Sequence, residues 1–234
     1  MQELIEKAYA YAEKILSENF NRHQQIISKT KSHIRYDRFY HIKRVTAWSN
    51  RICDELCGNN TVSDADAIGI VDELCDNTID RDCLHLASIL HDVGYNAYHI
   101  SEDHSVAGVV LAEQFLTAEG VEEEKKEKIL NLIRLHSRKD LMFEADTPLE
   151  LVILMEADLM DDMGASGLVM DAWINTRMNQ DETSFDTIFE HMQKYTQAQQ
   201  QAEPMRTEPA KRFWREKQEL VEEFMRQFAR DLNK

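Results

Sequence analysis

Residues that interrupt helices are scarce in this chain. It contains seven glycines and three prolines among 234 residues, and both residue types disfavour the interior of a helix. Strand-like alternation of β-branched residues is nearly absent, whereas apolar residues recur three and four positions apart, as in Leu4, Ala8, Tyr11 and Ile15. The sequence therefore predicts an all-α protein and argues against a fold built on β-sheets.

Long apolar runs are also missing. No stretch approaches the ~20 apolar residues that a membrane span needs. The N-terminal segment, residues 1–7, is acidic and amphipathic, and it lacks the basic stretch before an apolar run that marks a secretory signal. We therefore expect a cytoplasmic protein with no membrane partner.

The cysteines are few and form no recognisable metal motif. All four lie between residues 53 and 83, with no Cys-x-x-Cys pair and no histidine pair at zinc-finger spacing. Cys53 and Cys57 would share one face of a helix, so a zinc site is conceivable. The favoured interpretation is four reduced, small, partly buried thiols.

Positive charge is in short supply. The net charge is −16, and such a surface repels polyanions, so the chain is not expected to bind a nucleic-acid polymer. A small phosphate ester remains a suitable ligand if a metal ion supplies local positive charge.

Apolar periodicity and capping residues define the expected helices. They cover about 2–19, 21–30, 37–57, 64–75, 80–91, 102–118, 122–137, 148–162, 165–178, 184–200 and 206–232. Ser63 and Thr147 are candidate N-caps, Gly94 is a candidate helix stop, and Gly164 is expected to form a turn. No internal repeat or domain boundary is visible. The terminal amphipathic helix could pair with a second subunit as a homodimer, although packing on its own core is favoured.

Four residues in three distant apolar segments could bind one metal ion. They are His41, His91, Asp92 and Asp158. Taken singly, each has an ordinary explanation: a hydrogen-bonded core histidine, a helix C-cap, or a carboxylate paired with Arg134 or Arg138. However, a carboxylate inside an apolar helix costs several kcal/mol unless it is paired or metal-bound. The joint pattern therefore favours a metal site.

The same residues carry a family resemblance. His-x-x-Arg-Val at 41–45, Leu-His-Asp-Val-Gly at 90–94 and Glu-Ala-Asp-x-x-Asp-x-x-Gly-Ala at 156–165 resemble the HD-domain metal-dependent phosphohydrolases. Segments 102–105, 133–137 and 205–215 resemble later motifs of the family, the last one those of a bacterial subgroup that includes nucleotide pyrophosphatases. The resemblance covers roughly residues 36–232.

Because no domain boundary is visible, we expect a single all-α domain over 1–234. It would be an HD helical bundle with its core at about 36–178, an N-terminal helical extension, and a C-terminal helical extension at about 179–234. His41, His91, Asp92 and Asp158 would bind a divalent ion, and ligand type does not choose among Mn, Mg, Fe, Co, Ni and Zn. Metal-activated water would then attack the phosphorus of a small phosphorylated substrate, with a nucleotide expected.

Further catalytic roles follow from the same resemblance. His104 and His136 are candidates for second-metal ligands, phosphate donors or general acids. Asp161 shares a helix face with Asp158 and would orient water or a ligand histidine. Arg44, three residues after His41, would bind phosphate, or else form a structural salt bridge.

The chain also departs from family patterns. Many members carry a lysine three residues after the His-Asp pair, and Tyr95 stands there instead. The signatures of the cyclic-di-GMP phosphodiesterases and of the alarmone hydrolases are missing. Two other functions stay open: a di-metal HD oxygenase, which would use His104 and His136 as fifth and sixth ligands, and a non-catalytic, metal-stabilised scaffold.

Overall fold

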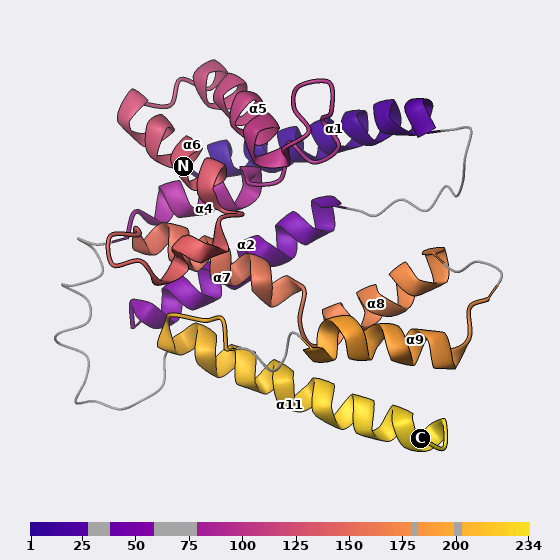
Figure 1. Cartoon of the computed structure of the whole chain (residues 1–234). Helices are drawn as coiled ribbons and strands as arrows, with labels where there is room; N and C mark the ends of the chain where they lie inside the picture. The colour runs from indigo at the N-terminus through magenta and orange to yellow at the C-terminus, as the bar shows by residue number, and fades with distance from the viewer. Residues whose placement is uncertain (28–37, 59–78, 179–181, 199–202) are drawn as a thin grey trace. The chain divides into compact units, whose positions relative to one another are not determined.

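The computed structural model describes residues 1–27, 38–58, 79–178, 182–198 and 203–234 (Figure 1). All regular secondary structure within these ranges is helical, which confirms the all-α prediction. The helix expected at 64–75 and its Ser63 cap lie outside the described residues. The chain divides into two compact units, Met1–Ala157 and Asp158–Lys234. The prediction of a single domain stays a prediction.

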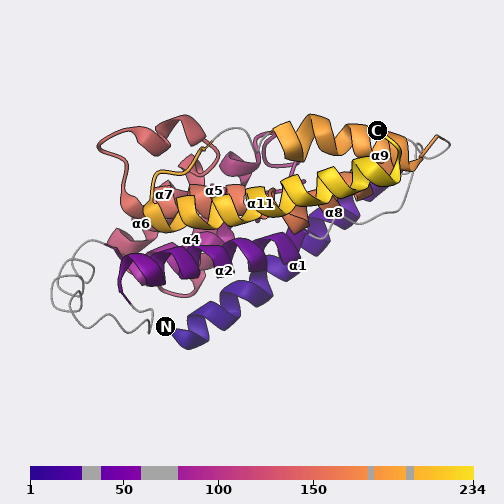
Figure 2. The ribbon, with the colours of Figure 1, turned by 90° about the horizontal axis from the view of Figure 1, so that it is seen from below.

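The first unit is organised around α4, its central helix (Figure 1). Its helices are α1 (Gln2–Ile27), α2 (Arg38–Leu56), α4 (Arg81–Leu90), α5 (His104–Ala118), α6 (Glu123–Leu135), the 3-10 helix η1 (Lys139–Phe143) and the larger part of α7 (Leu149–Asp161). Helix α4 packs against α1, α2 and α6, and α5 packs against α6. Figure 2 shows α1 and α2 side by side along this unit.

Helix α4 is short, but it is buried along most of its length and firmly anchored at its start. Its residues Leu84, Leu86, Ile89 and Leu90 are almost completely buried. Asp80 caps the helix by accepting a hydrogen bond from the Cys83 amide, 3.0 Å. Seven apolar or small side chains in ten residues explain why this helix lies at the centre. The chain leaves it directly at His91.

An ionic contact ties α4 to two other helices. The Glu150 carboxylate of α7 accepts from the Asp80 amide, 2.8 Å, and pairs with Lys128 of α6, 2.7 Å. This contact links the starts of α4 and α7 to α6.

Three local predictions for this unit are wrong. Residues 2–27 form one helix rather than two, because no glycine or proline interrupts them. Thr147 does not cap α7, because its hydroxyl donates instead to the Leu141 carbonyl, 2.6 Å. Gly94 is not a left-handed helix stop, since the glycines with positive φ among the described residues are Gly58, Gly120 and Gly164. The last of these confirms the expected turn before α8. Helix η1 was not predicted.

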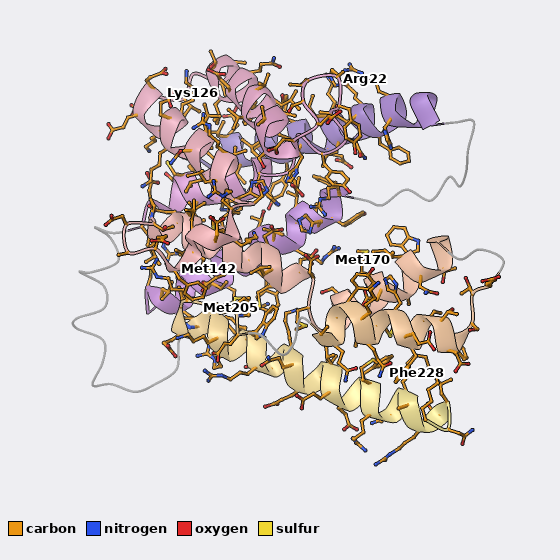
Figure 3. All side chains as sticks on the ribbon, in the orientation of Figure 1. Arg22, Lys126, Met142, Met170, Met205 and Phe228 are labelled. Carbon is orange, nitrogen blue, oxygen red and sulfur yellow. The ribbon has the colours of Figure 1, made fainter. Side chains whose placement is uncertain are left out.

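The second unit is a small helical packing around α11. It contains α8 (Ala165–Met178), α9 (Phe185–Met192), the π-helical turn η2 (Gln193–Gln197) and α11 (Glu208–Asp231). Helix α11 packs against α8 and α9, and Phe228 lies against Phe189 with ring centroids 5.5 Å apart (Figure 3). Thr207 caps α11 by accepting from the Ala210 amide, so part of the 205–215 motif has a structural role. A homodimer through α11 stays a prediction.

Two global expectations can be compared with the structure. No helix among the described residues is long and apolar enough to cross a membrane. Cys53 and Cys83 are free and buried, and burial raises the pKa of Cys83 to about 12. Cys57 is disulfide-bonded, so the expectation of four reduced thiols is wrong. The cytoplasmic location stays a prediction.

Candidate metal centre

The predicted site begins where α4 ends. His91 is the C-cap of α4 and Asp92 follows it in a turn, and both side chains are fully buried. The His91 Nδ1–H donates to the Ser88 carbonyl, 2.8 Å. Because a carbonyl only accepts, Nδ1 carries a proton, and Nε2 is the ring nitrogen that faces the site.

His41 meets this pair from α2. Its ring is buried, and its Nε2 lies 3.4 Å from the His91 Nε2 and 3.4 Å from the Asp92 Oδ2. The His91 Nε2 is 3.6 Å from the same oxygen. Three of the four predicted metal ligands therefore meet around Oδ2 of Asp92.

A second pair of histidines faces the other oxygen of Asp92. His104 is the first residue of α5, and His136 is the C-cap of α6. Their Nε2 atoms are 3.3 Å apart and lie 3.6 and 3.7 Å from the Asp92 Oδ1. His136 repeats the orientation of His91, because its Nδ1–H donates to the Ile133 carbonyl, 2.6 Å. Asp92 thus lies between two histidine pairs.

The donor set fits a divalent cation. Ligands at about 2.1 Å from one ion lie about 3.0–3.4 Å apart, close to the spacings among these atoms. His91, Asp92 and His136 each offer an atom within 4.8 Å of the others. Within the described part of the chain, the buried Asp92 Oδ1 has no hydrogen-bond partner. Such an oxygen is costly without a partner, and a bound cation would supply one.

Sequence reasoning missed Arg38. Its Nε donates to the Asp92 Oδ2, and its guanidinium lies over the Tyr95 ring, 4.6 Å from the centroid. Burial alone would raise the pKa of Asp92, but Arg38, His91, His136 and His41 together hold it well below its usual range. The available signal was spacing, because Arg38 lies three residues before His41 and so shares its helix face.

Burial also affects the pKa of His104. It lowers the pKa of this imidazole, a shift that Asp92 opposes and His136 and Arg38 reinforce. The neutral ring is the form that binds metals. The lowered pKa favours the form of His104 that ligation requires, and its predicted roles stay predictions.

Close backbone contact brings His104 to Asp92. A Cβ on Gly94 would lie 2.1 Å from the His104 carbonyl and 2.3 Å from the Gly108 amide. Gly94 is therefore needed for close approach between the turn after Asp92 and the first turn of α5. This contact explains why a glycine follows the His-Asp pair.

The N-terminal helix supports the same turn. The buried Asn19 of α1 donates from Nδ2 to the carbonyls of Val93, 3.1 Å, and Tyr95, 3.3 Å. The Tyr11 hydroxyl of the same helix donates to the Leu111 carbonyl on α5, 2.8 Å. Residues outside the recognised motifs therefore hold the segment that carries Tyr95, a role that no sequence motif indicated.

Three further predicted residues stand on α7 and α2. Asp158 and Asp161 stand at the end of α7 and belong to the second unit, and Asp161 is buried there. Arg44 is half-buried on α2. The roles predicted for these three residues stay predictions.

The chain matches the model of a known protein family. The HD domain model matches residues 38–163, more than half of the chain, so the chain belongs to the HD domain family, whose members are typically metal-dependent phosphohydrolases. No curated protein matches the chain.

Solved structures share the fold. Bacillus subtilis YpgQ is 16% identical with a TM-score of 0.56, over 92% of this chain and 96% of that one. Its complex with ADP gives the same identity and TM-score over 94% and 96%. The Lin1889 protein from Listeria innocua is 19% identical with a TM-score of 0.53, over 95% and 97%.

Proposed function

We propose that this protein is a phosphohydrolase that uses a divalent metal to hydrolyse a small phosphorylated compound, with a nucleotide as the expected substrate. The observation that carries the proposal is Asp92, a fully buried carboxylate whose two oxygens each face two imidazole nitrogens. A divalent ion held there would lower the pKa of a water molecule and polarise a phosphoryl group. Asp158 keeps its predicted place as the fourth ligand on the strength of the family motif.

The arrangement around Asp92 favours two metal ions over one. His41 and His91 gather at Oδ2, while His104 and His136 gather at Oδ1. A carboxylate that bridges two ions would use both oxygens in this way. We therefore assign His104 and His136 to a second ion, whose identity stays open among Mn, Mg, Fe, Co, Ni and Zn.

The nucleotide class is supported by a solved structure and by the charge of the chain. YpgQ, which shares the fold at 16% identity, has been crystallised with ADP. A net charge of −16 makes a small anion a difficult ligand for this chain unless cations concentrate at one place. The metal centre and Arg38 would provide that concentration.

The test combines metal analysis with a substrate panel. Wild-type protein, Asp92→Asn and Asp171→Asn would be assayed with Mn, Mg, Co and Ni on nucleoside mono-, di- and triphosphates and phosphodiesters. Asp171 is the matched control, a buried carboxylate of the second unit that accepts from the Thr196 amide, 3.1 Å. We expect Asp92→Asn to lose metal and activity and Asp171→Asn to keep both. Hydrolysis by metal-free Asp92→Asn protein would refute the proposal.

The two histidine pairs around Asp92 also support a second candidate function, that of an HD oxygenase. With Asp92 and Asp158, they would provide the six ligands that such a di-metal site needs. Oxygen consumption by the iron-loaded protein, together with no hydrolysis of any substrate in the panel, would favour that function. A protein that binds two ions and does neither would be a metal-stabilised scaffold.

A further inference from the structure

The chain lacks the lysine found in many HD proteins three residues after the His-Asp pair, yet a cation reaches this place. Tyr95 occupies the lysine position, and the Arg38 guanidinium lies 4.6 Å from the centroid of its ring. Arg38 comes from the first turn of α2, more than fifty residues earlier in the chain. The positive charge is thus supplied from another helix.

The exposure of the side chains distinguishes Arg38 from the candidate ligands around it. Asp92, His91 and His41 are at most 1% exposed, whereas the Arg38 side chain is 21% exposed. The His104 side chain, at 35%, is the other open member of the cluster. A substrate that enters from solvent therefore meets Arg38 at the edge of the site, before it reaches the buried carboxylate.

Lys139 is a nearby cation but a poor alternative. Its Nζ donates to the carbonyls of His136, 2.9 Å, and Met155, 3.3 Å. These bonds hold the lysine on the backbone next to the site. The Arg38 charge, by contrast, lies directly on Asp92.

We propose that Arg38, oriented by stacking on Tyr95, binds the phosphoryl group of the substrate, and this inference rests on the proposed function. A guanidinium is always charged and presents donors in a fixed plane that matches two phosphoryl oxygens, and an aromatic ring holds that plane in place. Without a metal, Arg38 neutralises Asp92. A divalent ion on Asp92 would compete for the same carboxylate and lower the cost of turning the guanidinium toward an anion.

Phosphate binding by metal-loaded protein tests this directly. The dissociation constant of inorganic phosphate would be measured by calorimetry on the manganese-loaded wild type, Arg38→Met, Tyr95→Leu, Tyr95→Phe and Lys43→Met. Lys43 is the matched control, an exposed cation of the same helix that lies 4.6 Å from the Phe39 ring centroid. Manganese content would be measured on every sample.

The variants should differ in their affinity for phosphate according to whether the altered residue contacts the phosphoryl group or orients Arg38. We expect Arg38→Met to weaken phosphate binding about 10- to 100-fold, the range for a lost charge-assisted hydrogen bond. Tyr95→Leu should weaken it about 3- to 10-fold through loss of stacking, while Tyr95→Phe and Lys43→Met stay near the wild type. Manganese content should be unchanged throughout.

Two results would overturn the inference. If Arg38→Met keeps its manganese and binds phosphate like the wild type, Arg38 is only a counter-ion for Asp92. If Arg38→Met loses its manganese, Arg38 supports the metal site and does not act by binding the phosphoryl group. A wild type that binds manganese and phosphate but hydrolyses nothing contradicts the proposed function alone, because the binding comparison still holds.

Discussion

Gly94→Ala should damage the site through the backbone alone, without removing any candidate ligand. The added Cβ would lie 2.1 Å from the His104 carbonyl, about 1.3 Å short of the 3.4 Å at which ordinary van der Waals contact begins. The opposing atoms belong to the backbone of α5, so no side chain can rotate away. The turn after Asp92 and the start of α5 must separate by about 1 Å.

The expected cost has a structural and a catalytic part. Inserting a methyl group into a tight contact costs about 2–3 kcal/mol, which for a chain of this length lowers the melting temperature by about 4–12 °C. A displacement of about 1 Å between His104 and Asp92 should lower kcat/KM about 100-fold. Thermal denaturation, manganese content and hydrolysis would be measured on the same preparation.

Gly108→Ala is the matched control, because Gly108 lies on the other side of the same contact. A Cβ there would be 3.3 Å from the His91 carbonyl and 3.4 Å from the Ile133 side chain. Shifts of a few tenths of an ångström would accommodate it, so we expect a loss below about 1 kcal/mol, partly offset by the better helix propensity of alanine. If Gly94→Ala matched Gly108→Ala in stability and metal content, the close-approach argument would be wrong.

Three further predictions concern the supports of the site. Asn19→Ala should lower the free energy of unfolding by about 1–3 kcal/mol, because two loop carbonyls lose their donor; urea denaturation measures this loss. The same variant should weaken phosphate binding, which calorimetry measures. Burial raises the pKa of Asp80, but the bond from Cys83 and the charge of Lys128 leave it below its usual range. Its stabilisation is therefore present above about pH 4 and lost as the pH falls further, and Asp80→Asn should flatten that acid limb in denaturation curves. Chelation of a metal held at 100 times its Kd should cost about 2.7 kcal/mol, seen as a lower melting temperature in the wild type but not in Asp92→Asn.

The sequence predicted the helices well because their apolar periodicity is strong and few residues interrupt it. Helices α2, α5 and α8 begin or end within about two residues of the expected positions. The errors arise where a contact with a residue outside the helix overrides a local signal. Thr147 is a good N-cap by type, but its hydroxyl bonds to Leu141. Gly94 is a good helix stop by type, but α5 requires it for another reason.

The sequence also predicted only part of the candidate site. The order of His41, His91 and Asp92 along the chain predicts that they meet, because the pattern is a family motif. Which oxygen of Asp92 each histidine faces depends on the packing of α2, α5 and α6 around α4, and sequence spacing does not encode it. Arg38 and Asn19 were missed for a related reason. Their partners lie more than fifty residues away, so neither forms a local pattern with the residues it contacts.

The positions of the candidate ligands at helix ends have a common physical basis. The last four carbonyls of an α-helix have no partner within the helix. In α4 and α6, a C-cap histidine donates its Nδ1–H to one of these carbonyls three residues earlier, Ser88 for His91 and Ile133 for His136. The bond stabilises the helix end, and at the same time it fixes the tautomer and points Nε2 away from the helix that carries it. Both helices end beside Asp92, so the same hydrogen bond, made at each helix end, directs one Nε2 atom toward each oxygen of this carboxylate. A histidine directly after an apolar helix, as in Leu90-His91 and Leu135-His136, therefore predicts how its ring is oriented. It indicates a metal site only when a further ligand such as Asp92 lies beside it.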